Sequence, residues 1–404
     1  RDGQPCRPPS ASATQGAGGV AAPTRNLPVL SVIAVVLALY IVWRVVWRLP
    51  IKAHYRIGLG VVVLGMALHH RIVSSFAGTM ASPEIPKAVI AVLATGFTTL
   101  LLTAVFVLVL DAVHVLLWLL RRPRVPALLR SRWLRPASAL VALLLSVYGV
   151  WQAMVVPQVR RIEVVMHDLP QAFDGYRVLQ LTDIHTSRLL TGPWVASVVR
   201  ESNALQPDLV VITGDLVDGS VAARADDFAP LAGLRATDGV IAITGNHEYY
   251  GEHAQWMEAF RRAGMQVLQN SRTQVNRNGE ALIIAGVTDP VAARYGLPLP
   301  DLDAALDGVA PSAPIVLLDH RPREAVANAR RGVDLQLSGH THGGHILGMH
   351  LLVKRANGGF VSGLYEVGDM QLYVSNGAGL WPGFAVRIGV PSEITEITLR
   401  RAAP

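Results

Sequence analysis

Four long apolar runs near the N-terminus constrain this chain more than any other feature. Residues 88–110 contain no charged side chain, and residues 28–43 contain none either. About 20 apolar residues in a helix cross a hydrocarbon core about 30 Å thick, and uncharged runs of this length are typical of membrane spans. We therefore expect four membrane-spanning helices, near residues 28–47, 57–78, 88–118 and 137–156.

The composition supports the same interpretation. Only 16% of the residues are charged, whereas about a quarter are charged in an average soluble domain. The third run is the longest. As one helix it would extend roughly 50 Å at about 1.5 Å per residue, so we expect it to tilt or to protrude from the bilayer.

Basic residues predict the orientation of these helices. They are concentrated in the connection after the first helix and in the connection before the last, and the other connections contain few. By the positive-inside rule both rich connections lie in the cytoplasm, so everything after residue 156 should lie outside it. The basic residues are Arg44, Arg48, Lys52 and Arg56 in the first connection, and Arg121, Arg122, Arg124, Arg130, Arg132 and Arg135 in the second.

The remaining sequence divides into two parts. Residues 1–26 are rich in small residues and proline, which predicts disorder. Residues 157–404 alternate β-rich runs with amphipathic stretches, the pattern of one α/β domain. The single cysteine, Cys6, excludes a disulfide framework and a cysteine metal cluster. The net charge of +7 is explained largely by residues that flank apolar runs, so we expect a membrane and no nucleic acid as partner.

Five predicted strands end in polar clusters: "LTDIHTS", "TGDLVDG", "TGNHEYY", "LLDHRP" and "LSGHTHGGH". In open α/β sheets ligands bind beyond the carboxyl ends of the strands, so these clusters should share one site. Seven nitrogen and oxygen donors exceed the needs of one tetrahedral ion, which predicts two divalent cations, with Mn, Fe and Zn all open. The donors are Asp183, His185, Asp215, Asn246, His320, His340 and His342.

The motifs "DIH", "GDLVD", "GNHE", a histidine after a strand, and "GHTH" follow one another in the order of the calcineurin-like metallophosphoesterase superfamily, which this chain resembles over roughly residues 160–400. The tail "NGAGLWPGFAVRIGVPSEITEITL" resembles the membrane-associated bacterial branch. The resemblance implies an α/β fold in four αββα layers, built from two mixed sheets. It also implies a multi-pass protein of the bacterial cell (inner) membrane.

The resemblance also implies roles for the site residues. Asp183, His185 and His342 would hold one metal ion. Asn246, His320 and His340 would hold the other, with Asp215 bridging the two. His247 would contact the phosphate and protonate the leaving group, and Asp218 would orient the site.

These roles describe a membrane-anchored phosphoesterase that cleaves a phosphate ester or pyrophosphate bond. Two cations lower the pKa of a shared water to near neutrality and so supply a hydroxide for attack on phosphorus. Location beside a bilayer favours a phospholipid or another lipid-linked phosphate as substrate.

Three alternatives remain at this stage. The first is a UDP-2,3-diacylglucosamine-type pyrophosphatase of lipid A biosynthesis, whose substrate is made inside the cell; the outward orientation argues against it. The second is a non-catalytic metal-binding membrane sensor or scaffold, which the complete donor set argues against. The third is a nuclease, for which few basic residues remain.

Several residues have two interpretations. His345 stands where the bacterial branch commonly has glutamine, and it either supports the site or lies solvated in a loop. Glu248 either assists the site or caps the following helix. The polar residues in or near the membrane form a relay or serve helix pairing and snorkelling: His69, His70, Asp111 and His114.

Overall fold

The computed structural model describes residues 27–120, 129 and 131–402, so the predicted disordered segment 1–26 lies outside the described residues. Within them, four helices are long and apolar enough to cross a membrane. These are α1 (Leu27–Arg44), α2 (Ala53–Phe76), α3 (Lys87–Leu119) and α5 (Leu134–Met154). The expectation of four apolar N-terminal helices is confirmed. The 33 residues of α3 form one continuous helix, about 50 Å long at about 1.5 Å per residue.

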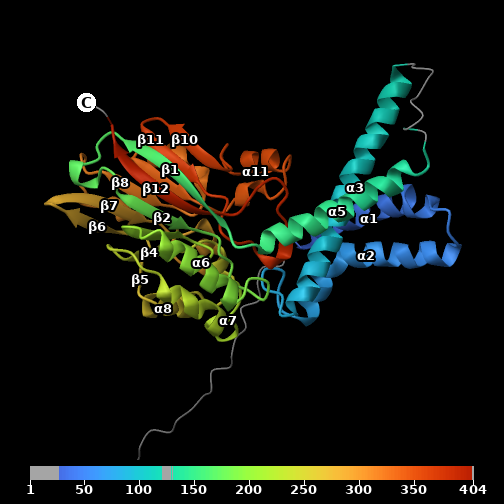
Figure 1. Cartoon of the computed structure of the whole chain (residues 1–404), viewed down its shortest axis with the longest axis horizontal. Coiled ribbons are helices and arrows are strands. Elements are labelled where there is room, and N and C mark those ends of the chain that lie inside the picture. The colour runs from blue at the N-terminus through green and yellow to red at the C-terminus, as the bar shows by residue number, and fades with distance from the viewer. Residues whose placement is uncertain (1–26, 121–128, 130, 403–404) are drawn as a thin grey trace, which may run out of the picture.

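Small residues line the contacts between these helices. Ala34, Ala38 and Ala104 are buried between α1 and its neighbours, whereas bulky side chains such as Val32 and Leu144 are exposed. This is the pattern of helices that approach one another through small residues and face lipid with large ones. In Figure 1 the connection between α1 and α2 and the facing ends of α3 and α5 lie away from the strands.

One carboxylate joins three of the four helices. Asp111 of α3 accepts hydrogen bonds from Tyr40 Oη (2.6 Å) and Arg44 Nε (2.7 Å) of α1, and from Arg135 Nη2 (2.6 Å) of α5. Two cations around one carboxylate satisfy a charge that would be costly to leave unpaired near lipid. Of the two interpretations of Asp111, these contacts support helix pairing.

Residues after α5 form two six-stranded mixed sheets that lie beside the helices (Figure 1). The first has the order β1-β12-β2-β3-β4-β5 and the second β10-β11-β9-β8-β7-β6. The strands of the first sheet are β1 (Gln158–Met166), β2 (Arg177–Leu181), β3 (Leu209–Thr213), β4 (Val240–Ile243), β5 (Met265–Val267) and β12 (Glu393–Arg401). Those of the second are β6 (Ser271–Arg277), β7 (Glu280–Gly286), β8 (Ile315–Leu318), β9 (Leu335–Ser338), β10 (Gly363–Val367) and β11 (Met370–Val374).

The alternation of side chains along each strand builds four layers. In β3, Leu209 and Val211 face the second sheet, while Val210 and Ile212 face helices. The first sheet is covered by α6 (Gly192–Ala204), α7 (Val221–Phe228) and α8 (His253–Arg262), and the second by α9 (Leu302–Leu306) and α10 (Ala325–Ala329). The αββα fold class is therefore confirmed. A last short helix, α11 (His350–Ala356), buries none of its residues.

Sequence patterns located the strands that carry the polar clusters but not β1, β5, β6 and β10. These four are short or lie at sheet edges, where polar side chains replace the apolar alternation. In β1, for example, the charged residues Arg160 and Glu163 are both exposed. Edge strands therefore carry too weak a hydrophobic signal to be recognised.

The helices contact the α/β unit through α3, through α5 and through the α2–α3 connection. In α5, the backbone oxygen of Gly149 accepts a hydrogen bond from Arg387 N (2.9 Å). The connection between α2 and α3, residues 77–86, contributes Glu84, which pairs with Arg188 (3.0 Å) and with Arg224. The membrane helices therefore pack directly on the part of the fold that carries the polar clusters.

Candidate metal centre

The polar residues that follow the strands share an unusual backbone conformation. Among the described residues, nine non-glycine residues have a positive φ, and six of them belong to the polar clusters. Such backbones cost roughly 1–3 kcal/mol each and persist where the surrounding fold enforces them, often at functional sites. The six residues are Asp183, His185, Asp215, His340, His342 and His345.

The first group of donors joins the ends of β2 and β9, which belong to different sheets. Asp183 Oδ1 lies 3.6 Å from His342 Nε2 and 3.8 Å from His185 Nε2, and all three side chains are buried. Gly339 permits this approach, since a Cβ there would collide with Thr182 Oγ1 and the Asp183 carboxylate. The three residues form a cluster with the size of a single metal site.

A second group surrounds Asp215. Its Oδ2 lies 3.2 Å from His320 Nε2 at the end of β8, and His340 completes this group. The same oxygen lies 3.7 Å from His185 Nε2, a member of the first group. Asp215 therefore stands between the two groups, where a bridging carboxylate would have to be.

Asn246 directly precedes His247, whose backbone nitrogen donates to Asp215 Oδ1 of the second group (2.8 Å). Its amide nitrogen donates to Tyr250 Oη (3.0 Å), which orients the amide. Its Oδ1 is buried without a hydrogen-bond partner among the described residues. A carbonyl oxygen left free in this way can serve as a metal ligand.

The geometry and chemistry of these donors fit divalent cations. Two ligands at about 2.1 Å from one ion lie about 3.4 Å apart at a tetrahedral angle, close to the 3.2–3.8 Å found here between nitrogen and oxygen donors. Three of the donor atoms, Asp183 Oδ1, His185 Nε2 and His320 Nε2, are buried with no hydrogen-bond partner among the described residues. Because buried polar atoms are nearly always satisfied, these atoms point to ligands of another kind.

The carboxylate of Asp218 lies beside the Nδ1 atoms of two imidazole rings. One carboxylate oxygen contacts His247 Nδ1, and the other lies 3.2 Å from His185 Nδ1. Burial opposes the charge of Asp218, but the neighbouring His247 and His185 outweigh it and lower the pKa of Asp218 below its ordinary value. Asp218 therefore acts as an anion that keeps the Nε2 atoms of both rings turned toward Asp215.

Glu248 is buried beneath the site, where its carboxylate binds backbone amides. It does not cap the following helix. Its carboxylate accepts hydrogen bonds from the backbone amides of Gly245 (2.7 Å), Leu216 (2.7 Å) and Asp215 (3.1 Å). Burial, followed by the charge of Asp215, raises the pKa of Glu248 to about 7. The helix-cap interpretation was wrong, because the chain forms a single 3₁₀ turn, His247–Tyr249, before α8 begins.

A sixth strand end, which the motifs did not indicate, closes the site. Residues 375–379 follow β11, and Gly379 N donates to the backbone oxygen of Asp183 (2.8 Å). The buried Arg387 donates to the backbone oxygens of Asn376 (2.7 Å) and Gly379 (2.9 Å) and so fixes this turn. The only signal in the sequence is the run "SNGAG" directly after a strand.

His345 is buried beside the first group. Its ring centroid lies 4.9 Å from that of His342, and only 8% of the residue is exposed. Burial, and then the positive charge of Arg387, lower the pKa of His345 to about 3, so the ring is neutral. The interpretation as a solvated loop residue was wrong, whereas a supporting role for His345 remains a prediction.

A cavity of about 270 Å³ opens beside His247 and Asp218. Its other wall comes from the α2–α3 connection, where Ser82 Oγ donates to the backbone oxygen of Asp218 (3.2 Å). No pattern in the sequence connected this segment with the site. Residues of the membrane region that line the cavity are Gly78, Thr79, Ala81, Ser82 and Glu84.

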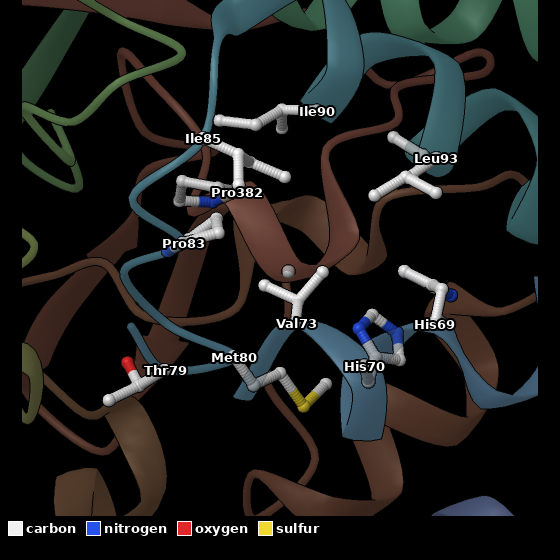
Figure 2. A pocket seen from close by; sticks show the side chains of 12 residues that line it. His69, His70, Val73, Thr79, Met80, Pro83, Ile85, Ile90, Leu93 and Pro382 are labelled. Atoms are coloured by element: carbon white, nitrogen blue, oxygen red, sulfur yellow. The ribbon is translucent and has the colours of Figure 1, made fainter. Parts of the chain in front are cut away.

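The intramembrane histidines lie apart from the donors. His69 and His70 pack against Phe97 and line a small cavity of about 20 Å³ between α2, α3 and the turn at Pro382 (Figure 2). The space suffices for about one water molecule. His114 contacts the backbone oxygens of Leu110 (2.7 Å) and Leu129 (3.0 Å). None of these three histidines belongs to the metal-ligand groups found in the described residues.

The pattern of the calcineurin-like phosphoesterase family matches residues 176–344. A "transmembrane protein with metallophosphoesterase domain" from Bos taurus is 35% identical over 289 residues, which cover 68% of this chain and 64% of that protein. Its counterpart from Danio rerio is 34% identical over 274 residues, covering 66% and 62%. The chain thus spans slightly less than two thirds of the length of these two relatives.

An uncharacterized metallophosphoesterase from Campylobacter jejuni is 33% identical over 273 residues. That alignment covers 66% of this chain and 71% of the relative. All of the donors at the ends of β2, β3, β4, β8 and β9 lie within the matched residues 176–344.

Proposed function

The chain belongs to the calcineurin-like metallophosphoesterase family, and on this premise we propose that it is a membrane-anchored phosphoesterase. It uses two divalent metal ions to hydrolyse a phosphate ester or pyrophosphate bond. The physiological substrate is a phospholipid or another lipid-linked phosphate.

The observation that carries the proposal is the pair of donor groups that meet at Asp215. Asp183, His185 and His342 form one group, and Asp215, His320 and His340 form the other, with the ligand atoms of each group within 4.8 Å of one another. Asn246 extends the second group. When bound, two divalent cations at these positions supply charge stabilisation for a phosphoryl group and lower the pKa of a water.

The remaining residues have roles that follow from their contacts. Asp218 orients the ring of His247 through Nδ1, so that Nε2 faces the site and can donate a proton to the leaving oxygen. Glu248 and Arg387 hold the backbone turns that carry Asp215 and Asp183. Their contribution is to keep the donors in one geometry throughout the reaction.

A lipid-linked substrate is supported by the cavity beside His247. One wall of this cavity belongs to the α2–α3 connection, which joins two of the apolar helices. A phosphate at His247 would therefore lie next to the ends of these helices, where the polar part of a lipid is found. A substrate free in solution would gain nothing from this placement.

The predicted orientation forms part of the proposal, with residues 157–404 outside the cytoplasm of a bacterial cell. It is supported by the helix ends, because the basic connection between α1 and α2, and the ends of α3 and α5 that face each other in sequence, lie remote from the α/β unit (Figure 1). Reporter fusions at the C-terminus test it. A periplasmic alkaline phosphatase fusion should be active and a cytoplasmic fluorescent fusion dark, and the opposite pattern would overturn the orientation.

The enzymatic proposal is tested with the full chain in detergent and Mn²⁺, Fe²⁺ or Zn²⁺. A panel of lipid phosphoesters is compared with the water-soluble headgroup of each lipid and with nucleotide pyrophosphates. We expect hydrolysis of at least one lipid-linked ester, with a higher kcat/KM than its headgroup alone. Equal rates for both would refute the lipid assignment while leaving the phosphoesterase intact.

Asp215→Asn is the control for the metal centre. Asp215 lies between the two groups, so its substitution should reduce hydrolysis of every ester in the panel. Undiminished activity in this variant would refute the bridging role. Metal binding by the parent protein without hydrolysis of any ester would favour a non-catalytic sensor or scaffold instead.

A further inference from the structure

A cluster of exposed leucines lies on the α/β unit close to the metal ligands. Leu347, Leu351 and Leu352 are 69%, 63% and 72% exposed, and we call these three residues the leucine patch. Two of them belong to α11, which has no buried residue at all. A helix that contributes nothing to the core of its own domain, yet carries large apolar side chains, indicates a partner outside the domain.

The leucine patch is joined to a membrane-spanning helix through one short link. Leu347 N donates to the backbone oxygen of Ile388 (2.9 Å). The side chains of Ile388 and Val386 in turn fill the space over Gly149 of α5, where a Cβ would lie 2.7 Å from each of them. The leucine patch is thus connected to α5 through two contacts, that of Leu347 with Ile388 and that of Ile388 with Gly149.

The position of Gly149 sets the depth of this contact. Gly149 lies five residues before the end of α5 at Met154, which is about 7.5 Å along the helix axis at about 1.5 Å per residue. Residues 385–389 therefore meet α5 below its end, at a level where an apolar helix is still in contact with lipid. Figure 1 shows α11 on the side of the α/β unit that faces the helices.

Basic residues follow the leucines in the same helix. Lys354 and Arg355 are exposed, and α11 contains no acidic residue. Short helices that combine apolar side chains with lysine and arginine bind at the boundary between headgroups and acyl chains, where the long basic side chains reach lipid phosphates. The charge of α11 therefore matches an anionic lipid surface.

From these observations we propose that the leucine patch inserts into the bilayer, in the leaflet where α5 ends. The partner is the lipid surface itself, held by Leu347, Leu351 and Leu352 with Lys354 and Arg355 at the headgroups. The α/β unit is then fixed to the membrane at a second place besides its covalent link to α5. This inference does not rest on the proposed enzymatic function.

Insertion has a consequence for the metal centre. His345, beside the first donor group, is only two residues before Leu347. A bilayer surface at Leu347 therefore places lipid headgroups within a short distance of the donors. The arrangement orients the α/β unit so that the site faces the membrane.

The test measures the environment of single positions in the full chain. Cys6, the one cysteine of the sequence, is replaced by serine, and Leu351→Cys or Leu352→Cys then receives a polarity-sensitive fluorophore. The protein is placed in nanodiscs of phosphatidylcholine with a minority of phosphatidylglycerol. Some of the lipids carry a quenching spin label at the headgroup end of an acyl chain.

Val165→Cys is the matched control, because Val165 is 47% exposed on the edge strand β1 and pairs in register with Arg400 near the C-terminus. We expect several-fold stronger quenching at both leucine positions than at Val165. Quenching no stronger than at Val165 would overturn the proposal. The melting temperature and metal affinity of each labelled protein confirm that it is folded.

A second measurement tests whether another copy of this chain, instead of lipid, covers the leucine patch. Proteins labelled at Leu352 with donor and acceptor fluorophores are mixed in detergent and then in nanodiscs large enough for two copies. Absence of energy transfer together with quenching by lipid supports the proposal. Strong energy transfer without quenching would show that a second copy covers the leucines, and the lipid assignment would be wrong.

Discussion

Replacing Asp218 by asparagine separates the two functions that we assign to its carboxylate. The two oxygens serve two rings, with His247 Nδ1 at one and His185 Nδ1 at the other (3.2 Å). Both rings turn Nε2 toward Asp215; His247 Nδ1 is hydrogen-bonded to Asp218, whereas His185 Nδ1 lies beside the other carboxylate oxygen at ion-pair distance. Asparagine retains one accepting oxygen, and its amide group would face the Nδ1 atom of the other ring.

The loss can be estimated from this geometry. One of the two rings loses its contact with a charged acceptor; a hydrogen bond to such an acceptor is worth about 1.5–3 kcal/mol. Since about 1.4 kcal/mol corresponds to a factor of ten, the expected effect is roughly 10- to 100-fold, the usual range for residues that orient metal ligands. If His185 loses its partner, metal affinity falls. If His247 loses it, kcat falls while metal affinity remains.

The assay is a metal titration of the full chain in detergent, combined with steady-state hydrolysis of a small soluble phosphodiester. Asp319→Asn is the matched control. Asp319 is also buried at a strand end, but it accepts from Arg321 N (3.2 Å) and Asn328 Nδ2 (3.2 Å) instead of from an imidazole. We expect Asp319→Asn to change both quantities little. Parent-like metal affinity and turnover in Asp218→Asn would refute the argument.

Three further predictions concern stability. Asp111→Asn leaves Arg44 and Arg135 with a neutral partner, so we expect a loss of about 1–3 kcal/mol, seen as a lower melting temperature in detergent. Tyr176→Phe removes the hydrogen bond to Asp238 Oδ2 (2.7 Å) and should cost about 1.5–3 kcal/mol at pH 8. Burial, and then Asp238, raise the pKa of Tyr176 above its ordinary value of 10.0, so this stabilisation is complete below pH 10 and lost as the pH rises further; the difference between parent and variant should narrow in alkaline melts. Removing the metal ions with a chelator should lower the melting temperature, and a metal concentration 100-fold above the dissociation constant should restore about 2.7 kcal/mol.

The sequence predicted the fold, and it predicted that six of the seven donors lie close together, because both depend on local patterns. Apolar runs without charge identified the helices, and short β-rich runs identified the central strands. The donors follow those strands directly, as Asp183 follows β2 and His340 follows β9. The carboxyl ends of parallel strands meet at one edge of a sheet, so residues far apart in the sequence were expected to meet.

The parts that could not be predicted depend on contacts between distant segments or on backbone conformation. Positive φ at Asp183 or His342 is enforced by the surrounding fold; aspartate and histidine adopt it more readily than most residues, but most of them do not, so the residue type alone does not reveal it. Glu248 looked like a helix cap because its real partners are backbone amides, which carry no sequence signal. His345 is buried only because Arg387 and Phe384, more than 35 residues later, return to cover it.

The contact between Ser82 and Asp218 connects the membrane region with the candidate metal centre. The backbone oxygen of Asp218 accepts from Ser82 Oγ (3.2 Å) and from Arg224 Nε (3.0 Å), and Arg224 is itself paired with Glu84. Both restraints originate in the α2–α3 connection. Since the Asp218 side chain contacts His247, a displacement of this connection would move His247, the proposed proton donor, relative to Asp215. A fragment that begins at β1 would keep every metal ligand but lose these restraints, so its ability to bind metal would exceed its ability to catalyse.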